Sequence, residues 1–233
     1  TPDAELLAAA NSGAILTAAG LQAQVDRLSA SPRLGDGIEA FLVDMMQIDG
    51  FDSMIKDASI YPKFNQLVAD SAEQQMIRTL VDHLVVQARD YREIFTTRDT
   101  FLNRSLAAVY QVPFVSDEEW APYTFPESAQ RAGIFSQIGF LSLYAHPGSS
   151  SPTVRGVKLH EIFLCEHTPE PPADVDFSSL VDSDAGTSRE RLLDHMNNPG
   201  CIVCHQRSDP PGLALEHFDG LGQRRRYENG QLI

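Results

Sequence analysis

Two thiols and an imidazole lie within five residues near the C-terminal end of the sequence, as Cys201, Cys204 and His205. Cysteines three positions apart can form thioether bonds to the two vinyl groups of one porphyrin, and a histidine directly after them can ligate the iron. The spacing therefore predicts one covalently bound haem c, with His205 as the proximal ligand of the iron.

Two other interpretations use the same residues, namely half of a structural zinc site and a C-x-x-C redox dithiol. A structural zinc site needs about four protein ligands, but the third cysteine, Cys165, is distant in sequence and has His167 as its close companion. A thioredoxin-like dithiol belongs to a βαβ setting, which the sequence does not indicate. Haem attachment is therefore favoured, and Cys165 is expected to be a buried apolar side chain.

A proline follows the haem histidine closely, in the segment Asp209-Pro210-Pro211-Gly212. The backbone carbonyl of Pro210 is predicted to accept a hydrogen bond from Nδ1–H of His205, which would fix the tautomer and assign Nε2 to the iron. An ordinary turn is the alternative interpretation of this segment.

The second axial ligand of the iron is expected to come from upstream of His205 or to be absent, because few residues follow His205. The candidates are His83, His146, His160, His167, His217, Met45, Met46, Met54, Met76 and Met196. His146 is the leading candidate, since it follows an apolar segment at a turn before Pro147 from which an imidazole could project into a pocket. The alternative is that His146 is a surface histidine.

Apolar residues recur at helical spacing through most of the chain. Ser151 before Pro152 predicts a capped helix start, Thr187 with Glu190 forms a capping-box pattern, and Asp99 is a further candidate cap. No segment alternates convincingly as a strand, so the fold class is predicted to be mainly α. The predicted helices cover residues 21–28, 38–48, 64–88, 101–110, 134–144, 151–164 and 187–196.

The chain is expected to hold an N-terminal helical bundle domain over residues 1–113 and a helical, loop-rich, cytochrome c-like haem domain over residues 128–233. Residues 114–127 are predicted to be a linker because they combine prolines and an acidic cluster with the single tryptophan. Residues 168–172 are too rich in proline for a helix and are expected to be extended.

The net charge of −14 repels nucleic acid and anionic lipid, and it favours either a basic redox partner protein or solubility alone. No apolar run is long enough for a transmembrane segment. The chain begins at Thr1, so any export signal is expected to have been removed or to lie outside this sequence. Because bacteria attach haem c outside the cytoplasm, a periplasmic or secreted location is expected.

The chain resembles the planctomycete-type cytochrome c domain proteins, which are large secreted bacterial proteins with several domains of unknown function around haem c motifs. The resemblance is carried by residues 131–134 (RAGI), 151–156 (SPTVRG), 201–205 (CIVCH), 209–216 (DPPGLALE), Tyr61-Pro62 and 101–107 (FLNRSLA). It implies a secreted, haem-dependent redox role. Ser208 stands where the family often has methionine, and members are usually longer at both ends, so this chain is expected to be part of a larger protein.

The main functional hypothesis is a monohaem c-type module that transfers single electrons outside the cytoplasm, within a larger redox protein or complex. The alternative is a haem enzyme of peroxidase or oxidase type with an open distal site, for which His146, Tyr144 and Arg155 are candidate residues. A third hypothesis makes the first half a docking module and the haem a structural or sensory element. The sequence leaves open whether the protein is an enzyme.

Overall fold

The structure is a computed structural model that describes residues 2–168, 186–197 and 199–233. Two compact units divide the chain, one up to Leu42 and one from Val43 onward. Most of the proline-rich stretch predicted to be extended, from residue 169, lies outside the described residues.

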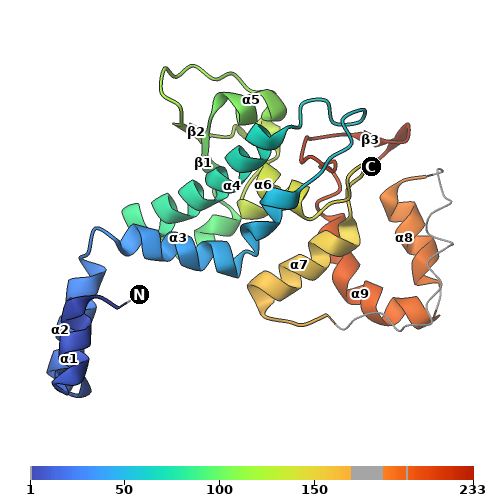
Figure 1. The fold of residues 1–233 in the computed structure, drawn as a ribbon. Coiled ribbons are helices and arrows are strands. Elements are labelled where there is room, and N and C mark those ends of the chain that lie inside the picture. Colours follow the sequence, from blue (N-terminus) through green and yellow to red (C-terminus); the bar gives the residue numbers. More distant parts are fainter. Residues whose placement is uncertain (1, 169–185, 198) are drawn as a thin grey trace. The chain divides into compact units, whose positions relative to one another are not determined.

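The first unit is a short run of helices, which includes the predicted helix over residues 21–28 (Figure 1). Asp3 caps the first helix by accepting a hydrogen bond from the Leu6 amide at 2.9 Å, and Arg27 of the next helix forms a 2.6 Å ion pair with the same carboxylate. The elements are α1 (Ala4–Asn11), α2 (Ala18–Ser29) and α3 (Leu34–Met45), of which α3 continues into the second unit.

The second unit is also mainly helical, so the predicted fold class is confirmed. Its helices are α4 (Gln66–Val81), α5 (Arg104–Tyr110), α6 (Ile138–Leu143), α7 (Pro152–Leu164), α8 (Ser188–Met196) and α9 (Pro199–Leu213). Its strands are β1 (Asp99–Leu102), β2 (Ala121–Thr124), β3 (Tyr227–Glu228) and β4 (Gln231–Leu232). The strands pair as short antiparallel ribbons, β1 with β2 and β3 with β4, which no alternating pattern in the sequence had indicated.

The predicted helix over residues 101–110 is split in the structure. Asn103 caps α5 by accepting a hydrogen bond from the Leu106 amide at 3.0 Å, and the residues before it are extended and pair with β2. A residue with an extended backbone and a short polar side chain is a favourable N-cap. This explains why the helix begins at Arg104 rather than near Asp99.

Other helix boundaries also differ from the predictions. The helix expected over residues 64–88 is α4, capped by Asn65 and followed by a single π-helical stretch at Asp82–Val86. The helix expected over 134–144 starts as a 3-10 turn at Ile134–Ser136 and becomes helical only at α6. By contrast, α7 begins at Pro152 with Ser151 as its cap, as predicted.

The core of the second unit forms around α4, which packs against α5, α6 and β1. Leu80, Leu102, Leu106, Phe140 and Leu141 are among its fully buried side chains. The strand β2 lies inside the predicted linker and is hydrogen-bonded to β1. The division into a bundle domain, a linker and a haem domain stays a prediction.

Arg155 is a fully buried cation that joins α7 to the segment after α9. Its guanidinium donates to the backbone carbonyls of Leu141 at 2.9 Å, Phe218 at 2.9 Å and Asp219 at 2.6 Å, and it pairs with Glu216 at 3.3 Å. Burial lowers the pKa of Arg155 to about 10, so it stays charged at neutral pH. These contacts give Arg155 a structural role.

Candidate haem-binding site

The helix α9 carries the whole Cys201–His205 motif. Positions three and four apart face the same side of a helix, so α9 presents both thiols and the imidazole together. Cys201 and Cys204 are free thiols of intermediate exposure. The helix continues to Leu213 with Pro210 and Pro211 inside its last turn, so this segment is not the ordinary turn that was the alternative interpretation.

His205 is oriented by a carboxylate one turn further along α9. Its Nδ1 lies 2.9 Å from Oδ2 of Asp209, whose side chain is fully buried. The other carboxylate oxygen of Asp209 accepts hydrogen bonds from the hydroxyls of Thr153, at 2.8 Å, and Ser208, at 3.1 Å. A carboxylate on Nδ1 makes Nε2 the nitrogen that would ligate a metal.

The predicted contact between His205 and the carbonyl of Pro210 is replaced in this structure. That carbonyl accepts the Ala214 amide at 3.2 Å within the helix, and Asp209 provides the partner of Nδ1. The sequence signal that could have identified Asp209 is its spacing of four residues from His205, which places both side chains on one face of a helix.

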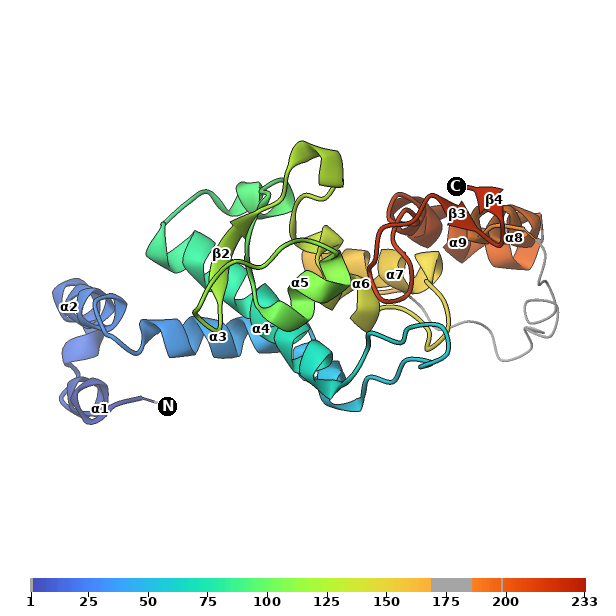
Figure 2. The same ribbon diagram turned by 90° about the horizontal axis from the view of Figure 1, so that it is seen from above.

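Two glycines let α7 and α9 approach each other closely (Figures 1 and 2). A Cβ on Gly156 would lie 1.7 Å from the carbonyl oxygen of Ser208, and a Cβ on Gly212 would lie 1.8 Å from that of Pro152. The pairs 152 with 212 and 156 with 208 define an antiparallel register. One turn further along this register, His160 of α7 lies level with Cys204 of α9.

A cavity of about 160 Å³ lies beside Cys204 and agrees with this register. It is lined by His160, Glu166, His167, Thr168, Val203, Cys204, Arg207 and Ser208. Two histidines from the list of possible axial ligands, His160 and His167, therefore lie at the haem motif. No sequence pattern indicated this, because the residues are far apart along the chain.

His160 is oriented by a carboxylate in the same way as His205. Its Nδ1 lies 2.6 Å from Oε2 of Glu166, and Arg207 pairs with the other oxygen of that carboxylate at 2.6 Å. The hydrogen bond with His160, followed by that with Arg207, lowers the pKa of Glu166. Glu166 is thus an ionised partner at neutral pH.

The end of α7 explains how Glu166 reaches back to His160. Cys165 adopts a left-handed conformation (φ 53°), and the Glu166 amide then donates to the His160 carbonyl at 3.1 Å. This reversal is the usual way in which a helix ends. Cys165 itself is exposed, so the prediction that it is buried is wrong, because the C-cap position turns it out of the helix.

The structure does not bring the other predicted residues to α9. His146 is exposed in the turn after α6, its carbonyl accepts a hydrogen bond from Lys56 at 3.2 Å, and it is not among the residues that line the cavity. Tyr144 is buried, with its hydroxyl donating to the Met46 carbonyl at 2.7 Å. Arg155 has the structural role described above. His146, Tyr144 and Arg155, the residues suggested for a peroxidase or oxidase, therefore do not come together in one site.

The residues present fit haem c. The helix offers two thiols and a histidine oriented by Asp209, and apolar side chains next to them are left exposed. Ile202 is 39% exposed and Val203 67% exposed, on the helix that carries the motif. Exposed apolar residues of this kind mark a surface that a hydrophobic ligand can cover.

The zinc interpretation finds less support. Within residues 2–168, 186–197 and 199–233, no three histidine, cysteine, aspartate or glutamate side chains gather closely enough to hold a metal ion. A structural zinc ion needs about four such ligands.

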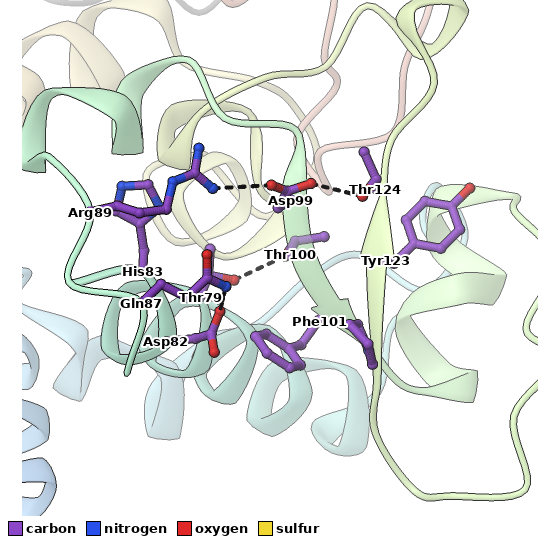
Figure 3. A pocket seen from close by; sticks show the side chains of 11 residues that line it. Thr79, Asp82, His83, Gln87, Arg89, Asp99, Thr100, Phe101, Tyr123 and Thr124 are labelled. Carbon is purple, nitrogen blue, oxygen red and sulfur yellow. Dashed lines mark hydrogen bonds and ion pairs between the residues drawn. The ribbon is translucent and has the colours of Figure 1, made fainter. Parts of the chain in front are cut away.

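A second cavity, of about 140 Å³, lies at the end of α4 against β1 and β2 (Figure 3). Its polar groups contact one another: Arg89 pairs with Asp99 at 3.2 Å, and Thr124 donates to Asp99 at 2.7 Å. His83, also in this lining, has Nε2 3.0 Å from the Asp90 carbonyl. These mutual contacts give the cavity a structural explanation.

Comparisons with known proteins identify two segments of the chain. Residues 1–112 match the family PSD4, described as a protein of unknown function (DUF1592), and residues 131–228 match PSCyt3, also described as a protein of unknown function (DUF1588). No curated protein and no solved structure matches the chain. No helix in the described part of the chain has the length and apolar character needed to cross a lipid bilayer.

The second match contains the haem motif, the two close-approach glycines and the His160–Glu166 pair. Cytochrome c-type families imply haem c binding and, in broad terms, a role in electron transfer. Residues 1–112 and residues 131–228 thus match the models of two planctomycete cytochrome c-type domain families, PSD4 and PSCyt3.

Proposed function

We propose that the chain is a monohaem c-type cytochrome module that transfers single electrons, as part of a larger redox protein or complex. The observation that carries this proposal is the motif on α9 with His205 oriented by the buried Asp209. When bound, haem c supplies a one-electron iron couple. The protein residues supply attachment, ligation and control of the environment.

Each residue has a distinct task in this proposal. Cys201 and Cys204 would hold the haem through thioether bonds, and His205 would ligate its iron through Nε2. Asp209 positions His205 and keeps its ring in one tautomer. Ile202 and Val203 are exposed apolar side chains that the ring could cover, and the Pro210 carbonyl accepts the Ala214 amide within the same helix. A hydrophobic, water-poor surrounding is one of the means by which a protein sets the potential of its haem.

The proposed setting is the periplasm or the exterior of a bacterial cell, where haem c is attached. The proposed partner is a basic redox protein, because the chain has a net charge of −14. Complementary charge raises the rate of encounter between partners.

The first test is replacement of both attachment cysteines. Production of the chain in a host that attaches haem c is expected to give a red protein whose intact mass includes one haem. The variant with Cys201→Ala and Cys204→Ala should have the apo mass and no haem that survives denaturation, because no thioether bond can form.

Cys165→Ala is the matched control, since it removes the exposed third thiol and should keep the haem. A colourless wild-type protein with only the apo mass, or covalent haem retained in the double variant, would contradict the proposal.

A further inference from the structure

The cavity beside Cys204 is lined by the imidazole of His160, which contacts a carboxylate through Nδ1 as His205 does. His205 on α9 has Nδ1 2.9 Å from the carboxylate of Asp209, and His160 on α7 has Nδ1 2.6 Å from the carboxylate of Glu166. Histidines that ligate metals through Nε2 commonly hold Nδ1 against a carboxylate or a carbonyl. Two imidazoles of this type therefore lie on the neighbouring helices α7 and α9. His160 lines the cavity together with Cys204, and His205 is the next residue along α9.

We propose that His160 is the second axial ligand of the haem iron, so that the haem has two histidine ligands. This inference rests on the proposed function, since it requires haem at Cys201 and Cys204. The antiparallel register set by Gly156 and Gly212 places His160 level with Cys204. The proposed ligand His160 and the attachment residue Cys204 also line the same cavity.

The surroundings of His160 support a ligand rather than a surface side chain. Its side chain is only 16% exposed, and Glu166 is held in turn by Arg207. The left-handed conformation of Cys165 fixes the path of the chain back to Glu166. The imidazole is therefore held before any haem is attached, which reduces the entropy lost on ligation.

Several of the other candidate ligands lie in less suitable places. His146 and His217 are exposed, and neither is among the residues that line this cavity. His83 lies in the other cavity with Nε2 against a carbonyl. Met46 and Met76 are buried in the core. His167 lines the same cavity but is exposed, which makes it the natural control.

Two histidine ligands have direct spectroscopic consequences. The iron should be six-coordinate and low-spin in both oxidation states, and reduced protein should bind carbon monoxide poorly because no axial position is open. The potential should lie below that of a cytochrome with histidine and methionine ligands, since methionine ligation raises it. A filled axial position favours electron transfer over catalysis at the iron.

The decisive experiment uses the haem-loaded full chain with His160→Ala, and His167→Ala as the control. Absorption and electron paramagnetic resonance spectra of His160→Ala should show loss of the low-spin signal and a gain in carbon monoxide binding. His167→Ala should match the wild type. Pyridine haemochrome content should stay unchanged in both variants, because His160 does not form the covalent attachment.

Two further measurements guard against a variant that merely misfolds. Added imidazole should restore the low-spin spectrum of His160→Ala, and His160→Met should remain low-spin with a higher midpoint potential. Low-spin, carbon monoxide-resistant His160→Ala protein would overturn the inference while leaving the proposed function intact, and so would a high-spin wild type. A wild type without covalent haem would overturn both proposals.

Discussion

At the scale of single residues, Asp209 is the group through which the protein can control the proposed iron ligand. It is fully buried, and its carboxylate contacts Nδ1 of His205 while it also accepts the hydroxyl hydrogen of Thr153. An ionised carboxylate on Nδ1 increases the basicity of the imidazole and so favours the ferric state. The spacing of His205 and Asp209 along one helix makes this contact local in sequence.

Asp209→Asn should therefore keep the covalent haem and raise its midpoint potential. If the substitution destabilises the ferric state by about 1.4 kcal/mol more than the ferrous state, the potential rises by about 60 mV for one electron. Potentiometric titration measures the change. Asp70→Asn on α4, where the carboxylate contacts Gln66, removes the same charge elsewhere and should leave the potential near the wild-type value. Equal shifts in the two variants would contradict a specific role for Asp209.

Lys56 predicts a pH dependence of stability. Its ammonium group donates to the carbonyls of Ser142 at 2.7 Å and His146 at 3.2 Å, and the residue is 6% exposed. Burial, and then the charge of Arg155, lower the pKa of Lys56 to about 8 from its ordinary 10.5. Between these values the unfolded chain binds more protons than the folded chain, so stability rises with pH in that window.

The free energy of unfolding of the wild type, relative to that of Lys56→Met, should increase by about 2 kcal/mol between about pH 7.5 and pH 9.5. Denaturant titrations of both proteins at the two pH values measure this difference. The comparison removes the contribution to stability of other titrating groups, because both proteins contain them. Tyr110, whose pKa is raised by burial, is one such group. A difference that stays constant with pH would contradict the lowered pKa of Lys56.

At the scale of elements, the pair α7 and α9 builds the candidate site. Ser151 and Pro152 start α7, the left-handed Cys165 ends it, and close backbone contact at Gly156 sets its register against α9. The register brings the His160–Glu166 pair to Cys204. The site therefore depends on a helix crossing that only small residues permit.

Gly156→Ala should break this crossing, because its Cβ would lie 1.7 Å from the backbone oxygen of Ser208. Overpacking of this kind costs about 1–3 kcal/mol, which denaturant unfolding of the haem-loaded protein can measure. Gly37→Ala on α3 is the matched control. No atom lies within 4 Å of its added Cβ, so better helix propensity should slightly stabilise it. Equal stability of the two variants would contradict the tight crossing.

At the scale of the whole molecule, charge is the property that bears on function. Acidic residues outnumber basic ones by 32 to 18, which gives the net charge of −14. Surface charge of one sign attracts partners of the other sign over a distance that salt shortens. The proposed redox partner is therefore basic, and its encounter with this chain should depend on ionic strength.

Small redox reagents of opposite charge can test this expectation on the haem-loaded protein. Oxidation by cationic hexaammineruthenium(III) should slow by about tenfold between about 0.01 M and 1 M ionic strength, because salt screens the attraction. Oxidation by anionic ferricyanide should instead become faster. Stopped-flow absorbance measures both rates. Rates that respond to salt in the same direction would mean that the net charge does not control the encounter.

Features that depend on neighbouring residues could be predicted from the sequence. The haem motif is one such feature, because the covalent chemistry requires fixed spacing over five residues. The helical fold class and the capped start of α7 are others, since periodicity and capping are local. The split at Asn103 was missed because the alternative, pairing of β1 with β2, involves residues about 20 positions away.

The sequence by itself determined the proposed cofactor, its attachment residues and the helical character of the protein. Only the tertiary structure decided which side chains surround the motif, with Asp209 rather than the Pro210 carbonyl at His205 and His160 rather than His146 beside Cys204. The physical reason is that contacts between residues a few positions apart follow directly from the order of those residues in the sequence. The approach of α7 to α9, by contrast, arises from packing between distant segments.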